Sequence, residues 1–226
     1  MGEHQHARQA ERTLRATETP IVDGLPDFPG ILTAMMISAD LATPLRLLAD
    51  ALLVKPFPGS TLTRPERELI ATAVSAGNDC FYCMDTHAAF ADALLQREGV
   101  GADRSRGLVD EVKDGRLTGL AERTRQLIRI ALIVRSSGRK LAGRHIAAAR
   151  SSGASNADVQ LTILIASAFC MYNRIVDGFR ARTPSDPTAF GERAQQIASY
   201  GYADPRITAV PTAASCVPAM SYLSLA

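Results

Sequence analysis

From Gly30 onward, the apolar residues of this chain recur three and four positions apart, and they nowhere alternate with polar residues as in a half-buried β-strand. That interval places apolar side chains on one face of an α-helix. Helices are therefore predicted over about 32–39, 43–53, 63–77, 80–95, 119–135, 140–151 and 156–181. The sequence predicts an all-α protein, built as a bundle of packed helices.

Two helix boundaries enclose the most informative part of the chain. Thr63 and Glu66 have the spacing of a capping box, in which each side chain binds the other's backbone N–H. Gly77 is predicted to end the helix that starts there. Asn78 or Asp79 is predicted to cap the next helix, which carries the sequence CFYCMDTHAAFADALL.

Other boundaries follow the same rules. Thr43 and Pro44 are predicted to cap and open the helix that ends near residue 53. Residues 97–107 are rich in glycine and charge and are predicted to be a link. Ser155 and Asp158 mark the start of the last long helix.

The length of 226 residues suits one domain. Residues 1–28 are predicted to be a flexible N-terminal arm, residues 29–202 the helical domain, and residues 203–226 an extended, proline-containing tail. The net charge is +2, and the basic residues between 123 and 135 alternate with apolar ones, as on a solvated helix face. No nucleic-acid partner is therefore expected.

The polar first twenty residues lack the apolar stretch of a secretory signal. The longest apolar run, Leu161 to Tyr172, is too short and too mixed to cross a bilayer, so a buried core helix is predicted. A cytoplasmic location with no membrane partner is expected. In the cytoplasm, paired cysteines are more often catalytic, redox-sensing or metal-binding than structural.

The chemistry is expected at Cys80, Cys83 and His87. They are three and four residues apart, so on one helix their side chains share a face. If Asp79 caps the helix, Cys80 lies in its first turn, where the helix dipole favours a thiolate. His87 can hold or remove a proton near neutral pH. A second thiol one turn away can trap a sulfenic acid as a disulfide.

Two other interpretations of these cysteines remain open. The CxxC pair and His87 could form part of a zinc site, for which a carboxylate would have to supply a ligand. The two cysteines could also be inert. Cys170 lies in an apolar stripe typical of a buried hydrophobic residue, and Cys216 lies in the tail. A thioredoxin fold is disfavoured because no βαβ pattern accompanies the motif.

A carboxylate for proton transfer is available upstream of the cysteines. Glu66 is assigned to the capping box, which leaves Glu68 as the candidate for a proton relay.

Residues 62–87 resemble the motif of the alkylhydroperoxidase D-like (AhpD-like) family of the carboxymuconolactone decarboxylase superfamily: a Glu, eleven residues, CxxC, three residues and a His. Glu68, Cys80, Cys83 and His87 match it position for position. The segment MYNRIVDGF at 171–179 is similar to the end of the core helix in the peroxidase-related subgroup. The resemblance covers about residues 25–202.

This resemblance implies an AhpD-like helical bundle, a homo-oligomer and a redox-active cysteine pair. It assigns peroxide attack to Cys83, resolution to Cys80, and the proton relay to Glu68 and His87. Tyr82 stands where some members carry a second histidine, and tyrosine is a poor base at neutral pH. That departure concerns the peroxidase rate and leaves the disulfide chemistry intact.

The function expected is a thiol peroxidase that reduces organic hydroperoxides, with no bound cofactor or metal and with an external dithiol donor such as a lipoyl group. The alternatives are a disulfide reductase serving a partner protein, a redox sensor without turnover, and a decarboxylase-type enzyme. The last of these has no need of a cysteine pair.

The bundle is also expected to contain two half-repeats. Residues 67–91 align with 125–149 at a shift of 58, which places Glu68 on Gln126 and His87 on His145. Cys80 and Cys83 have no cysteine counterparts. A chance match between two Ala-rich amphipathic helices would give a similar alignment. His145, without a thiol in its own segment, is predicted to have no catalytic role.

Overall fold

The computed structural model describes residues 10, 13 and 19–204. Within this part of the chain all regular structure is helical and there is no strand, which confirms the all-α prediction. The elements are α2 (Ile31–Ile37), α3 (Ala39–Leu53), α4 (Arg64–Gly77), α5 (Phe81–Arg97), α6 (Ala102–Lys113), α7 (Glu122–Ser136), η1 (Gly138–Lys140), α8 (Gly143–Ser151), α9 (Asn156–Gly178), η2 (Pro187–Phe190) and α10 (Gly191–Tyr200). The arm over 1–28 and the tail over 203–226 lie largely outside the described residues, as does Cys216.

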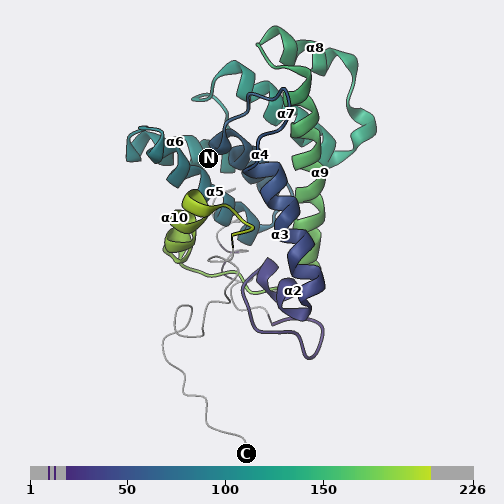
Figure 1. Cartoon of the computed structure of the whole chain (residues 1–226), viewed down its shortest axis with the longest axis vertical. Helices are drawn as coiled ribbons and strands as arrows, with labels where there is room; N and C mark the ends of the chain where they lie inside the picture. Colours follow the sequence, from purple (N-terminus) through teal and green to yellow (C-terminus); the bar gives the residue numbers. More distant parts are fainter. Residues whose placement is uncertain (1–9, 11–12, 14–18, 205–226) are drawn as a thin grey trace, which may run out of the picture.

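Helix α4 is the centre of the bundle. It packs against α5, α7 and α9, while α6 and α10 lie against the outer side of α5 (Figure 1). The main core is formed by apolar side chains of α3, α4, α7 and α9, among them Leu53, Ile70, Leu127, Ile128 and Leu161, none of which has exposed surface. A helix with so many neighbours is buried on nearly all sides, and α4 carries eleven buried residues.

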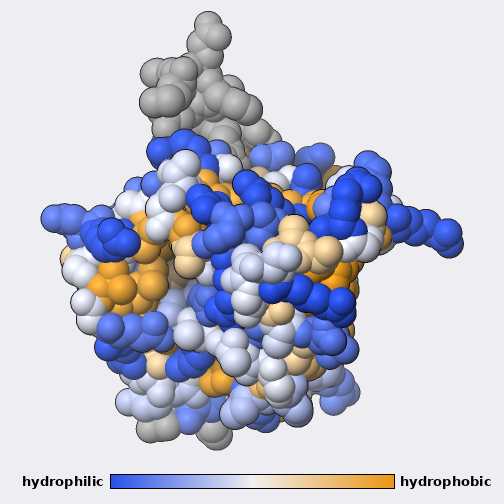
Figure 2. Space-filling view, turned by 90° about the horizontal axis from the view of Figure 1, so that it is seen from above, coloured by the Kyte–Doolittle hydropathy of each residue, from blue (hydrophilic) through white to orange (hydrophobic). Residues whose placement is uncertain are grey.

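Helix α9 is the longest element and runs along one side of the molecule (Figure 1). By length and composition alone it could cross a membrane, but half of its apolar window is buried inside the structure. It packs against both α4 and α7, as the core helix of a bundle does. Figure 2 shows the remaining apolar surface of one face as separate patches between hydrophilic side chains.

Several boundaries agree with the local sequence signals. Thr63 and Glu66 form the predicted capping box at the start of α4, with Thr63 N donating to Glu66 Oε2 at 2.9 Å. Ser155 and Asp158 form the equivalent structure at the start of α9. Helix α4 ends at Gly77 as predicted. Each of these helix boundaries depends on groups within four residues of it, so the local sequence is sufficient to determine where the helix begins or ends.

The predicted start of α3 is wrong. The helix begins at Ala39, capped by Ser38, whose hydroxyl accepts from Asp40 N at 3.1 Å. Pro44 lies inside the helix instead of opening it. A proline there lacks the N–H that would bind the Asp40 carbonyl, and the packing of α3 against α2, α4 and α9 offsets that loss.

Two helices were not predicted at all. Helix α6 occupies part of the expected link at 97–107 and continues to Lys113, and α10 follows η2 near the end of the domain. Both are short and largely polar, and α6 buries only Ser105, Val109 and Val112. Few apolar side chains mark either helix in the sequence, and both helices pack on α5.

The starts of α4 and α7, Arg64 and Glu122, are separated by the same 58 residues as the aligned sequences. After α7, however, the chain forms η1 and the short α8 where the shift would place a counterpart of α5. The correspondence between the two halves is therefore close in the first helix and poor in the second.

Asp158 ties the loop before α4 to the start of α9. Its side chain has no exposed surface and accepts hydrogen bonds from Ser60 Oγ and Thr61 N, both at 2.8 Å, and from Ser155 N at 2.9 Å. Burial opposes ionisation, but these hydrogen bonds and the charge of Arg123 outweigh it and lower the pKa of Asp158 from 3.8 to about 2.

We expect this carboxylate to make the stability of the fold depend on pH. Because the pKa in the folded state is depressed, the stabilisation is complete above the unfolded value near 4 and is lost as the pH falls towards 2. Asp158→Asn should therefore lower the free energy of unfolding at pH 7 by about 2 kcal/mol, with a smaller difference near pH 2. Urea denaturation at both pH values measures this.

The matched control is Asp103→Asn, which removes a fully solvated partner of Arg106. Exposed ion pairs contribute about 0–1 kcal/mol, so this variant should unfold nearly as the wild type does. Equal stability of the Asp158→Asn variant and the wild type at pH 7 would contradict the assignment.

Candidate active site

A three-residue turn between α4 and α5 places the cysteines. Asp79 has a φ of 56°, in the left-handed region, and α5 begins at Phe81. The N-cap is Cys80, without a side-chain capping bond, so the predicted capping by Asn78 or Asp79 is wrong. The Cys80 N–H donates to the Ser75 carbonyl at 3.1 Å. Cys83 is therefore the cysteine in the first helical turn.

Distant helices hold this turn in place. Arg135 at the end of α7 donates to the Gly77 carbonyl, at the C-terminal end of α4, where a cation is favoured by the helix dipole. Asn173 of α9 donates to Ser75 Oγ at 3.1 Å and accepts from Asn78 Nδ2 at 2.8 Å. Asn173 belongs to the MYNRIVDGF segment, so this segment of α9 has a structural task beside the cysteines.

The two thiols are in contact and buried. Cys80 has no exposed surface and Cys83 is 4% exposed; both are reduced in this structure. A hydrogen bond with Cys83, then burial and the negative charges of Cys83 and Asp177, raise the pKa of the Cys80 thiol. The expectation that Cys80 lies in the first helical turn is wrong, because Cys80 precedes the helix and Cys83 takes the position that the dipole favours for a negative charge.

An apolar cluster covers the sulfur atoms. It consists of Cys80, Cys83, Tyr82, Val176, Ala181 and Phe190. The Tyr82 ring meets Phe190 edge-on at a centroid distance of 5.8 Å. It also lies against Gly30, where an added Cβ would come within 2.1 Å of the ring and where φ is +55°. Only glycine fits this position, because any other side chain would displace Tyr82.

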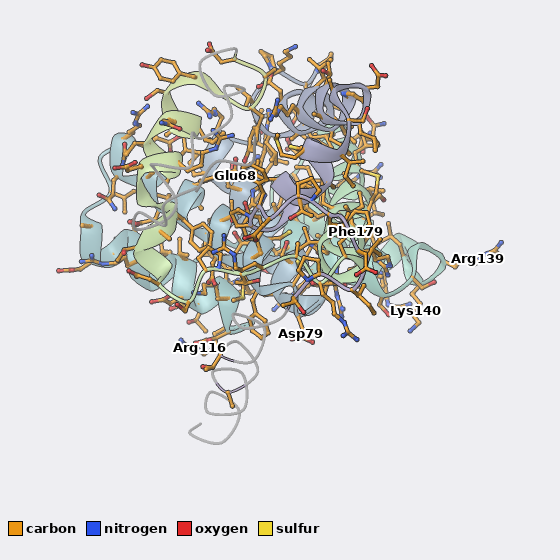
Figure 3. All side chains as sticks on the ribbon, turned by 90° about the horizontal axis from the view of Figure 1, so that it is seen from below. Glu68, Asp79, Arg116, Arg139, Lys140 and Phe179 are labelled. Carbon is orange, nitrogen blue, oxygen red and sulfur yellow. The ribbon has the colours of Figure 1, made fainter. Side chains whose placement is uncertain are left out.

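The carboxylate and the imidazole of the motif form a buried pair. Glu68 of α4 has no exposed surface, and its Oε2 lies 2.7 Å from Nδ1 of His87 on α5. Figure 3 shows Glu68 inside the bundle, whereas Asp79 lies at its edge. The His87 ring meets Phe169 of α9 edge-on at 4.5 Å. These contacts fix the ring, and Nδ1 is engaged by the carboxylate, so Nε2 is the nitrogen left to exchange protons.

Glu66 does not enter this site. Its Oε1 accepts from Arg123 Nη1 at 2.9 Å and from Thr124 Oγ1 at 2.8 Å, in addition to the capping bond of Oε2 to Thr63. The structure thus keeps the two carboxylates apart, with Glu66 joining α4 to α7 and Glu68 joining α4 to α5.

One residue of the site was not predicted. Tyr202 follows α10, and its hydroxyl donates to Glu68 Oε1 at 2.7 Å and lies 3.4 Å from His87 Nδ1. The sequence offered little to find it by, since a lone tyrosine at the end of the domain, 115 residues beyond His87, has no motif around it.

The other histidine and cysteine candidates lie elsewhere. His145 accepts a hydrogen bond from Ala142 N at 3.0 Å and so contributes to the start of α8. The half-buried Cys170 lies near Asn78 and the Arg135 carbonyl. Among the residues that the structure describes, no three His, Cys, Asp or Glu side chains are arranged to hold a metal ion.

A cavity of about 350 Å³ lies between α5, α6, η2 and α10, and Ala89 forms part of its wall. Ala89 also packs against the cluster that covers the sulfur atoms. Ala89 is thus shared between the wall of the cavity and the side chains around the sulfur atoms.

The chain shares this fold with two peroxidase-related crystal structures. An uncharacterized peroxidase-related protein from a Silicibacter species matches with a TM-score of 0.58 and 23% identity, over 73% of this chain and 88% of that one. An alkylhydroperoxidase AhpD core protein from Ralstonia eutropha, also described as an uncharacterized peroxidase-related protein, matches with a TM-score of 0.57 and 21% identity, over 84% and 90% of the two chains. No curated protein matches the chain in sequence.

Residues 42–100 match the model of the carboxymuconolactone decarboxylase family. This range contains α4 and α5 with Glu68, Cys80, Cys83 and His87, in the spacing of the AhpD-like motif. The chain is thus similar to the carboxymuconolactone decarboxylase family over the stretch that holds the motif, and it shares its fold with the two peroxidase-related structures.

Proposed function

We propose that the protein is a thiol peroxidase that reduces organic hydroperoxides through a dithiol/disulfide cycle of Cys80 and Cys83. The observation that carries this proposal is the buried pair of Glu68 and His87, joined at 2.7 Å, one helical turn from Cys83. A proton relay beside two thiols in contact is what such a cycle requires.

In the first step, Nε2 of His87 takes the proton of the Cys83 thiol, and the resulting thiolate attacks the distal oxygen of the hydroperoxide while the O–O bond breaks. The products are a sulfenic acid on Cys83 and an alcohol, whose oxygen takes a proton through His87. In the second step, the Cys80 thiol attacks the Cys83 sulfur, which forms the disulfide and releases water. An external dithiol then reduces the disulfide by exchange and leaves oxidised.

The structure supports this order of the two cysteines. Cys83 is the third residue of α5, where the helix dipole favours negative charge. His87 lies one turn further along the same helix. Cys80 keeps its proton, because its contact with Cys83 and its burial raise the pKa of its thiol. Cys80 thus lies in contact with Cys83, where it can resolve the sulfenic acid.

The covered sulfur atoms favour a small oxidant over a large one. With 0% and 4% exposed surface, Cys80 and Cys83 can meet a hydroperoxide that passes a layer of side chains more easily than the disulfide of a folded partner protein. This favours a peroxidase over a disulfide reductase. A redox sensor would use the same residues without turnover, and a decarboxylase-type reaction has no use for the dithiol.

Three further expectations stay predictions. Self-association is supported by exposed apolar side chains on the neighbouring helices α3 and α9, among them Leu41, Leu48, Leu164 and Met171. On each helix the two residues are seven positions apart, which places them on the same face. The cytoplasmic location and the lipoyl-type donor rest on the sequence.

The cysteine roles can be separated by substitution. Cys83→Ser should abolish peroxide turnover, whereas Cys80→Ser should react once and accumulate a sulfenic acid or a mixed disulfide, because no resolving thiol remains. Cys170→Ser is the control and should keep full turnover. Multiple-turnover assays with an organic hydroperoxide, together with peptide mass mapping, measure both effects. A Cys80→Ser variant that turns over normally, or a peroxide-induced bridge to Cys170 or Cys216, would refute the cycle.

Substitution of Glu68 should mainly lower activity, whereas substitution of Glu66 should mainly lower stability. Glu68→Gln should lower the peroxidase rate strongly while leaving the fold intact, because the amide cannot take part in proton transfer. Glu66→Gln should cost about 1 kcal/mol of stability, since it weakens the ion pair with Arg123, and should leave the rate nearly unchanged. Rates and melting temperatures of both variants decide this. An equal loss of rate in the two would undo the assignment.

The half-repeat alignment places His87 opposite His145. Substitution of these two histidines should affect turnover very differently. His87→Ala should lower turnover on the order of a hundredfold or more, the usual contribution of a general acid–base group. His145→Ala removes only an acceptor at the start of α8 and should leave turnover within a few fold. If His145→Ala reduced the rate as much as His87→Ala in a folded protein, the relay assigned to α4 and α5 would be wrong.

A further inference from the structure

The relay has a third member that comes from the far end of the domain. The Tyr202 hydroxyl lies 2.7 Å from Glu68 Oε1, on the carboxylate oxygen that His87 does not use. Its ring is stacked on the His87 ring, with an interplanar angle of 24° and a centroid distance of 6.2 Å. One tyrosine thus contacts both the acid and the base of the pair.

The chain is built to deliver this side chain. Arg64 of α4 donates to the carbonyls of Ile197 and Ala198 at 2.8 and 2.9 Å, which holds the C-terminal end of α10. Gly201 then turns the chain with a φ of +77°, and an added Cβ there would meet Asp50 Oδ1 at 2.7 Å. The Tyr202 N–H donates to the same Asp50 oxygen at 3.0 Å. Only glycine allows this turn, so the approach of Tyr202 to Glu68 is specified by the backbone.

The hydroxyl is a donor to Glu68, not an acceptor from it. Burial first, and then the negative charge of Glu68 and the hydrogen bond to it, raise the pKa of Tyr202 well above 10, while the charges of Arg64 and Arg193 oppose this. The phenol is therefore neutral at physiological pH, and its single proton goes to the nearer acceptor, the carboxylate.

We propose that Tyr202 is a positioning residue of the relay, whose hydroxyl keeps Glu68 ionised and so leaves Nε2 of His87 unprotonated as the base of the reaction. Glu68 has no exposed surface, so an ionised carboxylate there depends on donors from the protein. With two donors, His87 Nδ1–H and Tyr202 O–H, each oxygen is satisfied. With one donor removed, the carboxylate becomes more basic and the pair takes up an additional proton more readily.

The consequence for turnover rests on the proposed peroxidase function, whereas the effect on protonation does not. A pair that has taken up the additional proton carries hydrogen on Nε2 of His87, which then cannot accept the proton of an incoming hydroperoxide or thiol. Loss of the hydroxyl should therefore lower kcat at neutral pH while KM changes little, because Tyr202 contacts the relay and not the sulfur atoms.

The test compares Tyr202→Phe with Tyr172→Phe in the full chain. Tyr172 is also buried, and its hydroxyl donates to the Leu45 carbonyl at 2.7 Å without reaching the relay. Nitrogen-15 NMR of the His87 ring follows protonation of Nε2 against pH. We expect Tyr202→Phe to move this protonation to higher pH by about one unit, a tenfold change in proton affinity, and Tyr172→Phe to leave it in place.

A second measurement avoids any loss of packing. Replacement of Tyr202 by 3-fluorotyrosine keeps the ring and makes the hydroxyl a stronger donor, so Nε2 protonation should move to lower pH. An unchanged titration in both Tyr202 variants would overturn the proposal. Absence of peroxide turnover in the wild type would instead reject the proposed function, while the NMR titration would still decide the role of Tyr202.

Discussion

A fully buried carboxylate must find donors within the protein, and Glu68 imposes this requirement at the centre of the bundle. One oxygen is matched by His87 from α5 and the other by Tyr202 from beyond α10. Three separate segments thus meet at one charge. Because an unmatched buried charge would cost several kcal/mol, the docking of α10 onto α4 and α5 and the integrity of the relay are linked energetically.

The sequence was most informative where structure is set by near neighbours. The capping boxes at Thr63 and Ser155 and the helix end at Gly77 depend on groups a few residues away. These boundaries were predictable because each depends on residues a few positions apart. The pairing of Glu68 with His87 was implied by the family resemblance, and in the structure a hydrogen bond joins them.

The sequence was least informative where distant segments decide. The left-handed Asp79, which moves the start of α5 past Cys80, lies in a turn held by Arg135 from α7 and Asn173 from α9. Tyr202 reaches Glu68 through anchors on α3 and α4. No local pattern encodes such contacts. The same contacts put Cys83 instead of Cys80 in the first turn of α5, because a shift of one residue separates a helix cap from a first turn.

The separation of the site's members along the chain has a consequence during synthesis. Glu68 and His87 are 19 residues apart, whereas Tyr202 is 134 residues from Glu68. Contacts between near neighbours require the closure of smaller loops and can form early. The ribosome adds roughly 5–20 residues per second, so the last of the domain follows the end of α5 by several seconds. During that interval the hairpin of α4 and α5 can carry both thiols without the side chains of Val176, Ala181 and Phe190 over them. The dithiol is thus open to oxidants in the nascent chain and becomes shielded only when the end of the domain has been made.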